Sequence, residues 1–213
     1  STRMIGGLIM VHGDDRGLVL PPKVAPVQVE VVPIAQHKEG VLEKANELFF
    51  ALKNAGLRVE LDDSEKSAGW KFNECEMKGI PVRVEIGPKD IEKGTVVLVR
   101  RDNFEKTFAP MENLADTIKT LLEDIHNNLF EQAKARRDAH ITQATDFETF
   151  KQGVNGGFVE AMWCGERDCE DAIKAETGAT TRCMPFGEHK CLSDVCVHCG
   201  RPAKRLMIFA KAY

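Results

Sequence analysis

Six of the seven cysteines lie between residues 164 and 199, and their spacing suits a metal site. A tetrahedral zinc site needs four soft ligands, and a pair separated by two to four residues lets one turn present two thiolates. Cys196-Val-His-Cys199 and Cys164-Gly-Glu-Arg-Asp-Cys169 supply two such pairs, and Gly200 permits a tight turn after the first of these. We predict that these four cysteines bind zinc. The site should be structural, because four thiolates leave no position open for water.

Four further soft donors in this region leave alternatives open: Cys183, His189, Cys191 and His198. We interpret the two cysteines as core and surface thiols, although either could replace an assigned ligand, as could either histidine. His198 is expected to point outward from its turn. A dithiol oxidoreductase would also use two cysteines separated by two residues. That function requires Cys196 to open a helix, and Gly200 and Pro202 disfavour one.

A second group of candidates lies in and after the polar stretch 62–81. The stretch mixes acidic and basic side chains, so the simplest interpretation is a helix with a solvated charged face. The functional alternative is that paired donors and acceptors read bases splayed out of an RNA loop. Glu76 could accept from a guanine edge. Arg83, Lys89 and Lys106 could donate to base or phosphate oxygens.

Two nearby features have competing interpretations. Trp70 is expected in the core or at a helix cap rather than as a stacking platform, because its size favours burial. The pair Arg100-Arg101 at the end of a strand could contact phosphates or simply be solvated.

Hydrophobic periodicity predicts the elements that carry these residues. We expect a buried, Ser1-capped helix at 2–12, with Gly13 as its stop. Strand, helix and strand at 27–32, 41–55 and 57–61 predict a right-handed parallel crossover. The remaining expected elements are helices at 70–78, 111–128 and 146–151, and strands at 82–86, 95–99, 158–163 and 206–209. The first sheet should therefore be mixed.

Composition narrows the class of protein. A chain of 213 residues is long enough for two folded units. The net charge of −4 and the isoelectric point near 5.9 argue against indiscriminate coating of nucleic acid, so any RNA contact should be local. No apolar stretch approaches the roughly 20 residues that span a bilayer. The expected setting is a reducing cytoplasm, because clustered cysteines without an apparent leader favour metal ligation. The absence of an initiator methionine suggests a piece of a longer protein.

Longer motifs point to one family. Gly69-Trp-Lys-Phe72 and the run from Glu76 to Asp90 resemble the anticodon-binding domain of prolyl-tRNA synthetases, of the form shared by archaea, eukaryotes and some bacteria. Three later segments are similar to the zinc-bearing carboxy-terminal domain of these enzymes: Thr180–Phe186, Cys196–Pro202 and Phe209–Tyr213. Ser1-Thr-Arg-Met-Ile-Gly6 resembles the end of the third signature motif of class II synthetases. The resemblance covers nearly the whole chain.

The resemblance implies an α/β fold class and three domains. Residues 1–24 would be the tail of a class II catalytic domain. Residues 25–138 would form a mixed-sheet anticodon-binding domain flanked by helices. Residues 139–213 would form a small α/β zinc-binding domain.

The resemblance also implies a function. The full-length enzyme would be a cytoplasmic, homodimeric proline–tRNA ligase that uses ATP and Mg²⁺ to join proline to tRNA(Pro), with no membrane partner. Arg3 would be the arginine that contacts ATP, and this chain alone is not expected to activate proline. Four residues occupy positions that read the two guanines of proline anticodons: Glu76, Arg83, Lys89 and Lys106. A stand-alone accessory module with an anticodon-binding-like domain is the alternative.

Overall fold

The computed structural model describes residues 1–187 and 189–212 and divides the chain into two compact units, Ser1–Ala133 and Lys134–Tyr213. The domain boundaries predicted at residues 24/25 and 138/139 stay predictions. Within the described residues, no helix combines the length and the apolar character needed to cross a membrane.

The first unit is built on a five-stranded mixed sheet with the order β2-β1-β3-β4-β5. Its strands are β1 Val29–Pro33, β2 Val59–Leu61, β3 Val82–Ile86, β4 Thr95–Arg100 and β5 Lys106–Pro110. β1 pairs in parallel with β2 and β3, while β4 pairs antiparallel with β3 and β5. The predicted parallel crossover and mixed sheet are confirmed.

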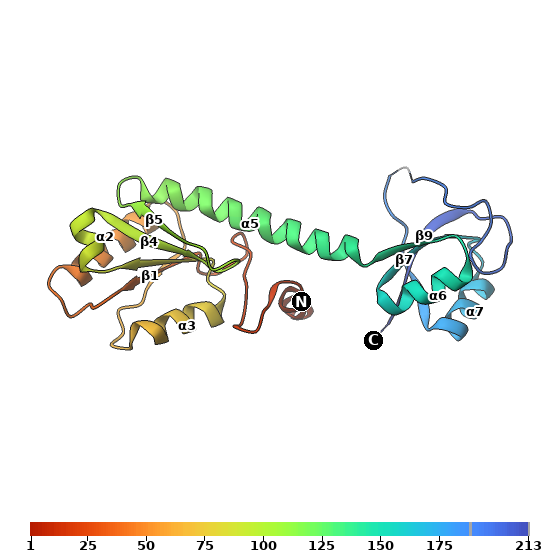
Figure 1. Cartoon of the computed structure of the whole chain (residues 1–213), viewed down its shortest axis with the longest axis horizontal. Coiled ribbons are helices and arrows are strands. Elements are labelled where there is room, and N and C mark those ends of the chain that lie inside the picture. The colour runs from red at the N-terminus through yellow and green to blue at the C-terminus, as the bar shows by residue number, and fades with distance from the viewer. Residues whose placement is uncertain (188, 213) are drawn as a thin grey trace. The chain divides into compact units, whose positions relative to one another are not determined.

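Helices cover both faces of this sheet (Figure 1). They are α2 Val41–Asn54, α3 Ala68–Lys78, α4 Pro88–Lys93 and α5 Leu114–Ala139. α2 and α5 bury their apolar stripes against alternate residues of the strands, such as Val29, Val84 and Leu98. α3 lies on the opposite face, so polar residues of β3 point toward it. The last residues of α5 belong to the second unit.

Helix α1 Arg3–His12 forms where predicted, but its surroundings differ from the expectation. Ser1 is not the cap: Thr2 takes that position, without a side-chain hydrogen bond. None of its residues is buried, and Met4 and Met10 are 74% and 71% exposed. The expectation of a buried face was therefore wrong for this chain. Periodicity identifies an apolar face but does not show what covers it.

The second unit has a four-stranded sheet with the order β6-β7-β9-β8. Its elements are β6 Ile141–Ala144, α6 Phe147–Gly156, β7 Phe158–Trp163, α7 Arg167–Thr177, β8 Ala179–Cys183 and β9 Arg205–Lys211. β6 and β7 run parallel, and β9 is antiparallel to β7 and β8. The core packs Phe150 against Phe209 edge to face, with ring centroids 5.1 Å apart. The α/β class predicted for both units is confirmed.

Candidate metal centre and nucleic-acid interface

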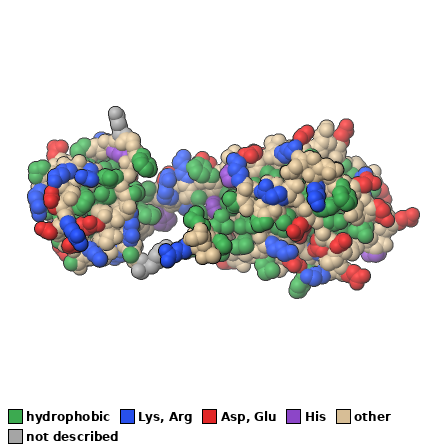
Figure 2. Space-filling model, turned by 180° about the vertical axis from the view of Figure 1, so that it is seen from behind, with side chains coloured by type: hydrophobic (Ala, Val, Ile, Leu, Met, Phe, Trp, Pro, Cys, Tyr) green, Lys and Arg blue, Asp and Glu red, His purple; other side chains and the backbone are tan. Residues whose placement is uncertain are grey.

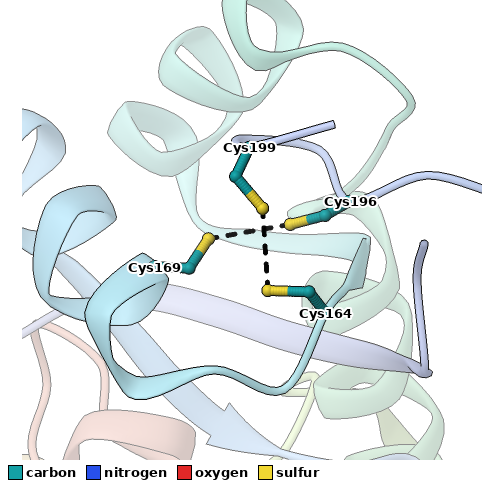
Figure 3. A group of neighbouring side chains, drawn as sticks. All are labelled: Cys164, Cys169, Cys196 and Cys199. Atoms are coloured by element: carbon teal, nitrogen blue, oxygen red, sulfur yellow. Dashed lines mark hydrogen bonds between the residues drawn. The ribbon is translucent and has the colours of Figure 1, made fainter. Parts of the chain in front are cut away.

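The four predicted cysteine ligands converge at one end of the second sheet (Figure 3). Cys164 directly follows β7, and Cys169 lies in the first turn of α7. Cys196 and Cys199 belong to the turn before β9. Helix α7 was not predicted from the sequence, and its first turn brings Cys169 back toward Cys164 across four intervening residues.

The distances between the sulfur atoms suit a metal ion. All four Sγ atoms lie within 4.8 Å of one another. Two pairs, Cys169–Cys196 and Cys164–Cys199, are each 3.7 Å apart. A tetrahedral zinc–sulfur bond of about 2.3 Å gives sulfur–sulfur edges of about 3.8 Å. The cluster could therefore hold a metal ion.

The other soft donors have different surroundings. Cys183 and Cys191 are exposed, and Sγ of Cys191 donates to the backbone oxygen of Ser193 at 3.3 Å. His189 is exposed, whereas His198 does not point outward as expected. Nδ1 of His198 lies 3.6 Å from Sγ of Cys169, and its side chain is only 18% exposed.

The thiols of the cluster have unequal affinities for protons. Burial raises the pKa of Cys164 and Cys169. Burial also opposes the thiolate of Cys196, but hydrogen bonds from backbone groups of residues 199, 198 and 164 outweigh it and lower its pKa to about 7. The turn around Cys196 thus favours a thiolate, while its neighbours need a nearby cation to ionise together.

A chain of alternating charges forms the second candidate site, in the first unit. Nη1 of Arg83 lies 3.2 Å from Oε1 of Glu76 on α3. Nε of Arg83 donates to Oε1 of Glu85 at 3.0 Å. Nζ of Lys106 lies 3.7 Å from the same oxygen. Three of the four residues predicted to contact the anticodon are thus linked, two directly and Lys106 through Glu85.

The strand register explains this meeting. Arg83 on β3 lies opposite Val99 on β4, and Val99 lies opposite Lys106 on β5. Directly opposed residues share one face of a sheet, and Glu85 shares it because it is two residues from Arg83. This is the face on which α3 lies (Figure 1). In Figure 2, lysines and arginines are interspersed with acidic residues over the surface. This mixture agrees with the prediction that any contact with RNA is local.

Two members of the site were missed by the sequence analysis. Glu85 links Arg83 to Lys106, and the ring of Phe72 lies beside both cations. The Arg83 guanidinium carbon is 4.1 Å from the ring centroid of Phe72, and Nζ of Lys106 is 5.8 Å from it. Sequence spacing could have identified both residues. Phe72 precedes Glu76 by four residues on a helix, and Glu85 follows Arg83 by two residues on a strand.

The remaining predicted site residues lie apart from this chain of charges. Lys89 is exposed on α4, just after β3. Asp90 fixes that helix start by accepting from the Gly87 backbone N–H at 2.9 Å. Arg3 is the first residue of α1 and is exposed.

Trp70 and the pair Arg100-Arg101 each had two competing interpretations, and the structure shows their surroundings. Trp70 is 59% exposed and therefore lies outside the core. It lies instead in the capped first turn of α3, as the alternative expectation had it: its backbone N–H donates to the Ser67 side chain at 3.4 Å, and its Nε1 donates to Glu74 at 3.1 Å. Arg101 is buried and forms a bidentate ion pair with Asp14, at 2.6 and 2.7 Å. Arg100 pairs with Asp102 at 2.7 Å. Neither arginine is simply solvated.

Glu30 on β1 is buried beneath α3, next to Cys75. It is 4% exposed, and its Oε2 has no partner within the described part of the chain. Burial raises the pKa of Glu30, and burial likewise raises that of the Cys75 thiol. Cys75 is therefore an unreactive thiol within the fold.

Comparison with known proteins defines the class. Residues 28–121 match the family model described as anticodon binding domain, and residues 147–213 match prolyl-tRNA synthetase, C-terminal. The chain thus joins an anticodon-binding domain to the C-terminal domain of a class of aminoacyl-tRNA synthetases.

Curated relatives agree with both matches. Proline--tRNA ligases of Lachnospira eligens and Ruminiclostridium cellulolyticum are each 56% identical over the whole chain. A proline--tRNA ligase 2 of Bacillus cereus is 59% identical, also over the whole chain. In each case the match covers 45% of the relative's length. The chain belongs to the prolyl-tRNA synthetase family and corresponds to the C-terminal part of these enzymes.

Proposed function

We propose that this chain reads the anticodon loop of tRNA(Pro) on behalf of a proline–tRNA ligase. The whole enzyme would join proline to tRNA(Pro) at the expense of ATP, with Mg²⁺, as a homodimer in the cytoplasm. Arg3 would contact ATP in that context. The chain spans less than half the length of its curated relatives, so the catalytic steps are assigned to the whole protein.

The network of Glu76, Arg83, Glu85 and Lys106 supports this proposal most strongly. A guanine presents two neighbouring N–H donors on one edge and acceptor atoms on another. Glu76 offers carboxylate oxygens for the first, and Arg83 and Lys106 offer donors for the second. The ion pairs hold these side chains in place before RNA arrives, which lowers the ordering cost of binding.

Phe72 and Lys89 would complete the interface. The Phe72 ring lies against the Arg83 guanidinium, and its half-buried side chain could stack on a splayed base. Lys89 is exposed and would contact a phosphate or base oxygen. Stacking on Phe72 would tolerate any base, whereas bidentate contacts to base edges carry specificity.

In the second unit we propose that Cys164, Cys169, Cys196 and Cys199 hold a structural zinc ion. The four sulfur donors are soft and lie within 4.8 Å of one another, and four thiolates around one ion leave no position open for water. When bound, zinc would supply a cross-link between α7 and the turn before β9. The chain's own backbone hydrogen bonds already favour the thiolate of Cys196.

The test is binding of this chain to a proline anticodon stem-loop, and to the same hairpin with both anticodon guanines replaced. Both titrations use one stated salt concentration, because phosphate contacts depend on salt. We expect the replacement to weaken binding about ten- to a hundredfold, the effect of losing a bidentate base contact of ~1–3 kcal/mol. Equal binding of both hairpins would reduce the site to generic phosphate contacts and favour the accessory module.

A further inference from the structure

His198 bridges the cysteine cluster and the far end of helix α7. Its Nδ1 lies 3.6 Å from Sγ of Cys169, and its Nε2 lies 3.0 Å from Oε1 of Glu176. The imidazole is mostly buried between these groups, with 18% of the side chain exposed. One side chain thus contacts a candidate metal ligand and a carboxylate at once.

Helix geometry explains why both contacts are possible. Cys169 and Glu176 are seven residues apart on α7, close to two full turns, so they lie on one face of the helix. His198 comes from the turn that also carries Cys196 and Cys199. It therefore ties the two halves of the cluster together outside the sulfur atoms.

A third contact fixes the plane of the imidazole. The ring of Phe147 meets it edge to face, with centroids 4.7 Å apart and an angle of 75°. Lys151 lies 4.7 Å from the Phe147 centroid, and its Nζ is 3.6 Å from Oε2 of Glu176. The carboxylate that holds His198 is thus itself held in place.

The Cys169 sulfur and the Glu176 carboxylate determine which hydrogen bonds the two ring nitrogens of His198 can form. A metal-bound cysteine sulfur carries no proton and can only accept a hydrogen bond, and an ionised Glu176 likewise only accepts. Nδ1 of His198 faces the sulfur, so an N–H at this nitrogen is the donor that the sulfur can use. Groups that hydrogen-bond to metal ligands from outside orient those ligands and tune the metal.

We propose that His198 is a positioning residue of the metal centre: it donates from Nδ1 to the Cys169 thiolate, while Glu176 fixes its ring. The inference rests on the proposal that the four cysteines bind zinc. This hydrogen bond holds the Cys169 sulfur in the orientation that the metal needs, and that effect outweighs the small loss of electron density on the sulfur. Cys169 should therefore be slower to leave the metal than it would be without His198.

The experiment compares this chain with variants at both contacts. Zinc transfer to a chromogenic chelator is timed, and the sulfur-to-metal charge-transfer band is recorded after Co²⁺ substitution. His198→Ala should release zinc about 10- to 100-fold faster, the usual cost of losing such an outer contact. The Co²⁺ band should move to lower energy, because the Cys169 sulfur becomes more electron-rich. Glu176→Gln should change both readouts in the same direction but less.

A conservative variant separates the hydrogen bond from simple packing. The amide of His198→Asn can place an N–H near the position of Nδ1 but cannot reach Glu176. It should restore much of the zinc retention and of the band position. Equal losses in His198→Ala and His198→Asn would assign the effect to packing against Phe147 and would overturn the proposal.

Two controls make the same chemical deletions elsewhere. His189→Ala removes an exposed imidazole, and Asp171→Asn removes an exposed carboxylate from α7. Both control variants should release zinc at the rate of the parent chain and show the same Co²⁺ band. An unchanged release rate and band in His198→Ala would also overturn the inference. If the parent chain binds no zinc at all, the proposed metal site itself fails, and this outcome is distinct from the others.

Discussion

The two units hold their polar groups together by different means. In the first unit, Arg83 lies between Glu76 and Glu85, so each of these three charges has a partner of opposite sign. In the second unit, four thiols face one another within 4.8 Å, a group that could hold a metal ion. The first arrangement is complete within the protein, whereas the proposed zinc ion would complete the second.

If the proposed zinc is bound, only the second unit would depend on a ligand for its fold. The first core joins buried residues from all of β1, β3, β4, α2 and α5. The second core includes Cys164, Cys169 and Cys196 among its buried members, so the candidate metal centre is part of it. Small domains with a modest hydrophobic core commonly rely on a metal ion or another cross-link for stability.

Metal removal should have the largest effect and should act on one unit only. Structural zinc contributes about 10–16 kcal/mol of binding free energy in small zinc domains, and that energy is folding energy. We expect a strong chelator, or Cys169→Ser, to abolish cooperative unfolding of the second unit. The buried Trp163, next to Cys164, reports this loss through its fluorescence in a Trp70→Phe background.

The first unit supplies the internal control for that experiment. Hydrogen exchange of β1 and β3 peptides should be unchanged by the chelator, because its ion pairs involve no metal. A matching loss of protection in both units would show that the first also depends on the ion. Retention of a cooperative Trp163 transition after complete zinc removal would show that neither does.

Substitution of Arg83 should have the next largest effect. Arg83→Met leaves Glu76 and Glu85 facing each other with side chains only 16% and 12% exposed. Removing one partner of a buried ion pair typically costs about 3–5 kcal/mol. We expect the urea midpoint of the first unit to fall, while that of the second stays fixed, and stem-loop binding to be lost.

Lys106→Met is the matched control for Arg83→Met. The Lys106 side chain is 56% exposed, and an exposed pair contributes less than about 1 kcal/mol. It should leave stability nearly unchanged yet weaken stem-loop binding. Equal destabilisation by both substitutions would contradict the view that Arg83 alone anchors the network.

The elements that the sequence predicted were those with strong apolar periodicity. β3 and β7 begin and end at the predicted residues, because each alternates or runs apolar between clear breakers. Helix α7 was missed because its sequence, RDCEDAIKAET, is mostly charged and its few buried residues include Cys169 and Ile173. Edge strand β5 was missed because most of its residues are exposed.

More of the metal centre than of the charged network could be predicted from the sequence, for a physical reason. Metal ligands have a fixed chemistry and narrow spacing, so the four cysteines could be chosen from sequence alone. The partners of Arg83 depend on strand register, which places Lys106 beside Glu85 across β4. The contact between His198 and Glu176 needs α7, and the sequence analysis did not predict that helix.

Glu30 allows a smaller test, since it is a buried charge without the pairing that Arg83 has. Burial raises its folded pKa, so it favours folding below the unfolded pKa of about 4.3, and this contribution is lost as pH rises through the raised value. Glu30→Gln removes this dependence. Relative to the parent, the variant should gain stability on the order of 1 kcal/mol between about pH 4 and 7, as measured by urea unfolding. A constant difference across that range would contradict the assignment.

The smallest effect is expected at Asp14, whose titration has the opposite sign to that of Glu30. The hydrogen bonds from Arg101 hold the pKa of Asp14 below its usual range, so its contribution is present above about pH 4 and is lost as pH falls through the lowered value. The Asp14 side chain is 39% exposed, and Asn keeps one acceptor for Arg101, so Asp14→Asn should cost less than about 1 kcal/mol near neutral pH. The cost should vanish in acid, while exposed Asp15→Asn should show none at either pH. A cost that persists at low pH would mean that the carboxylate acts through its shape and not through its charge.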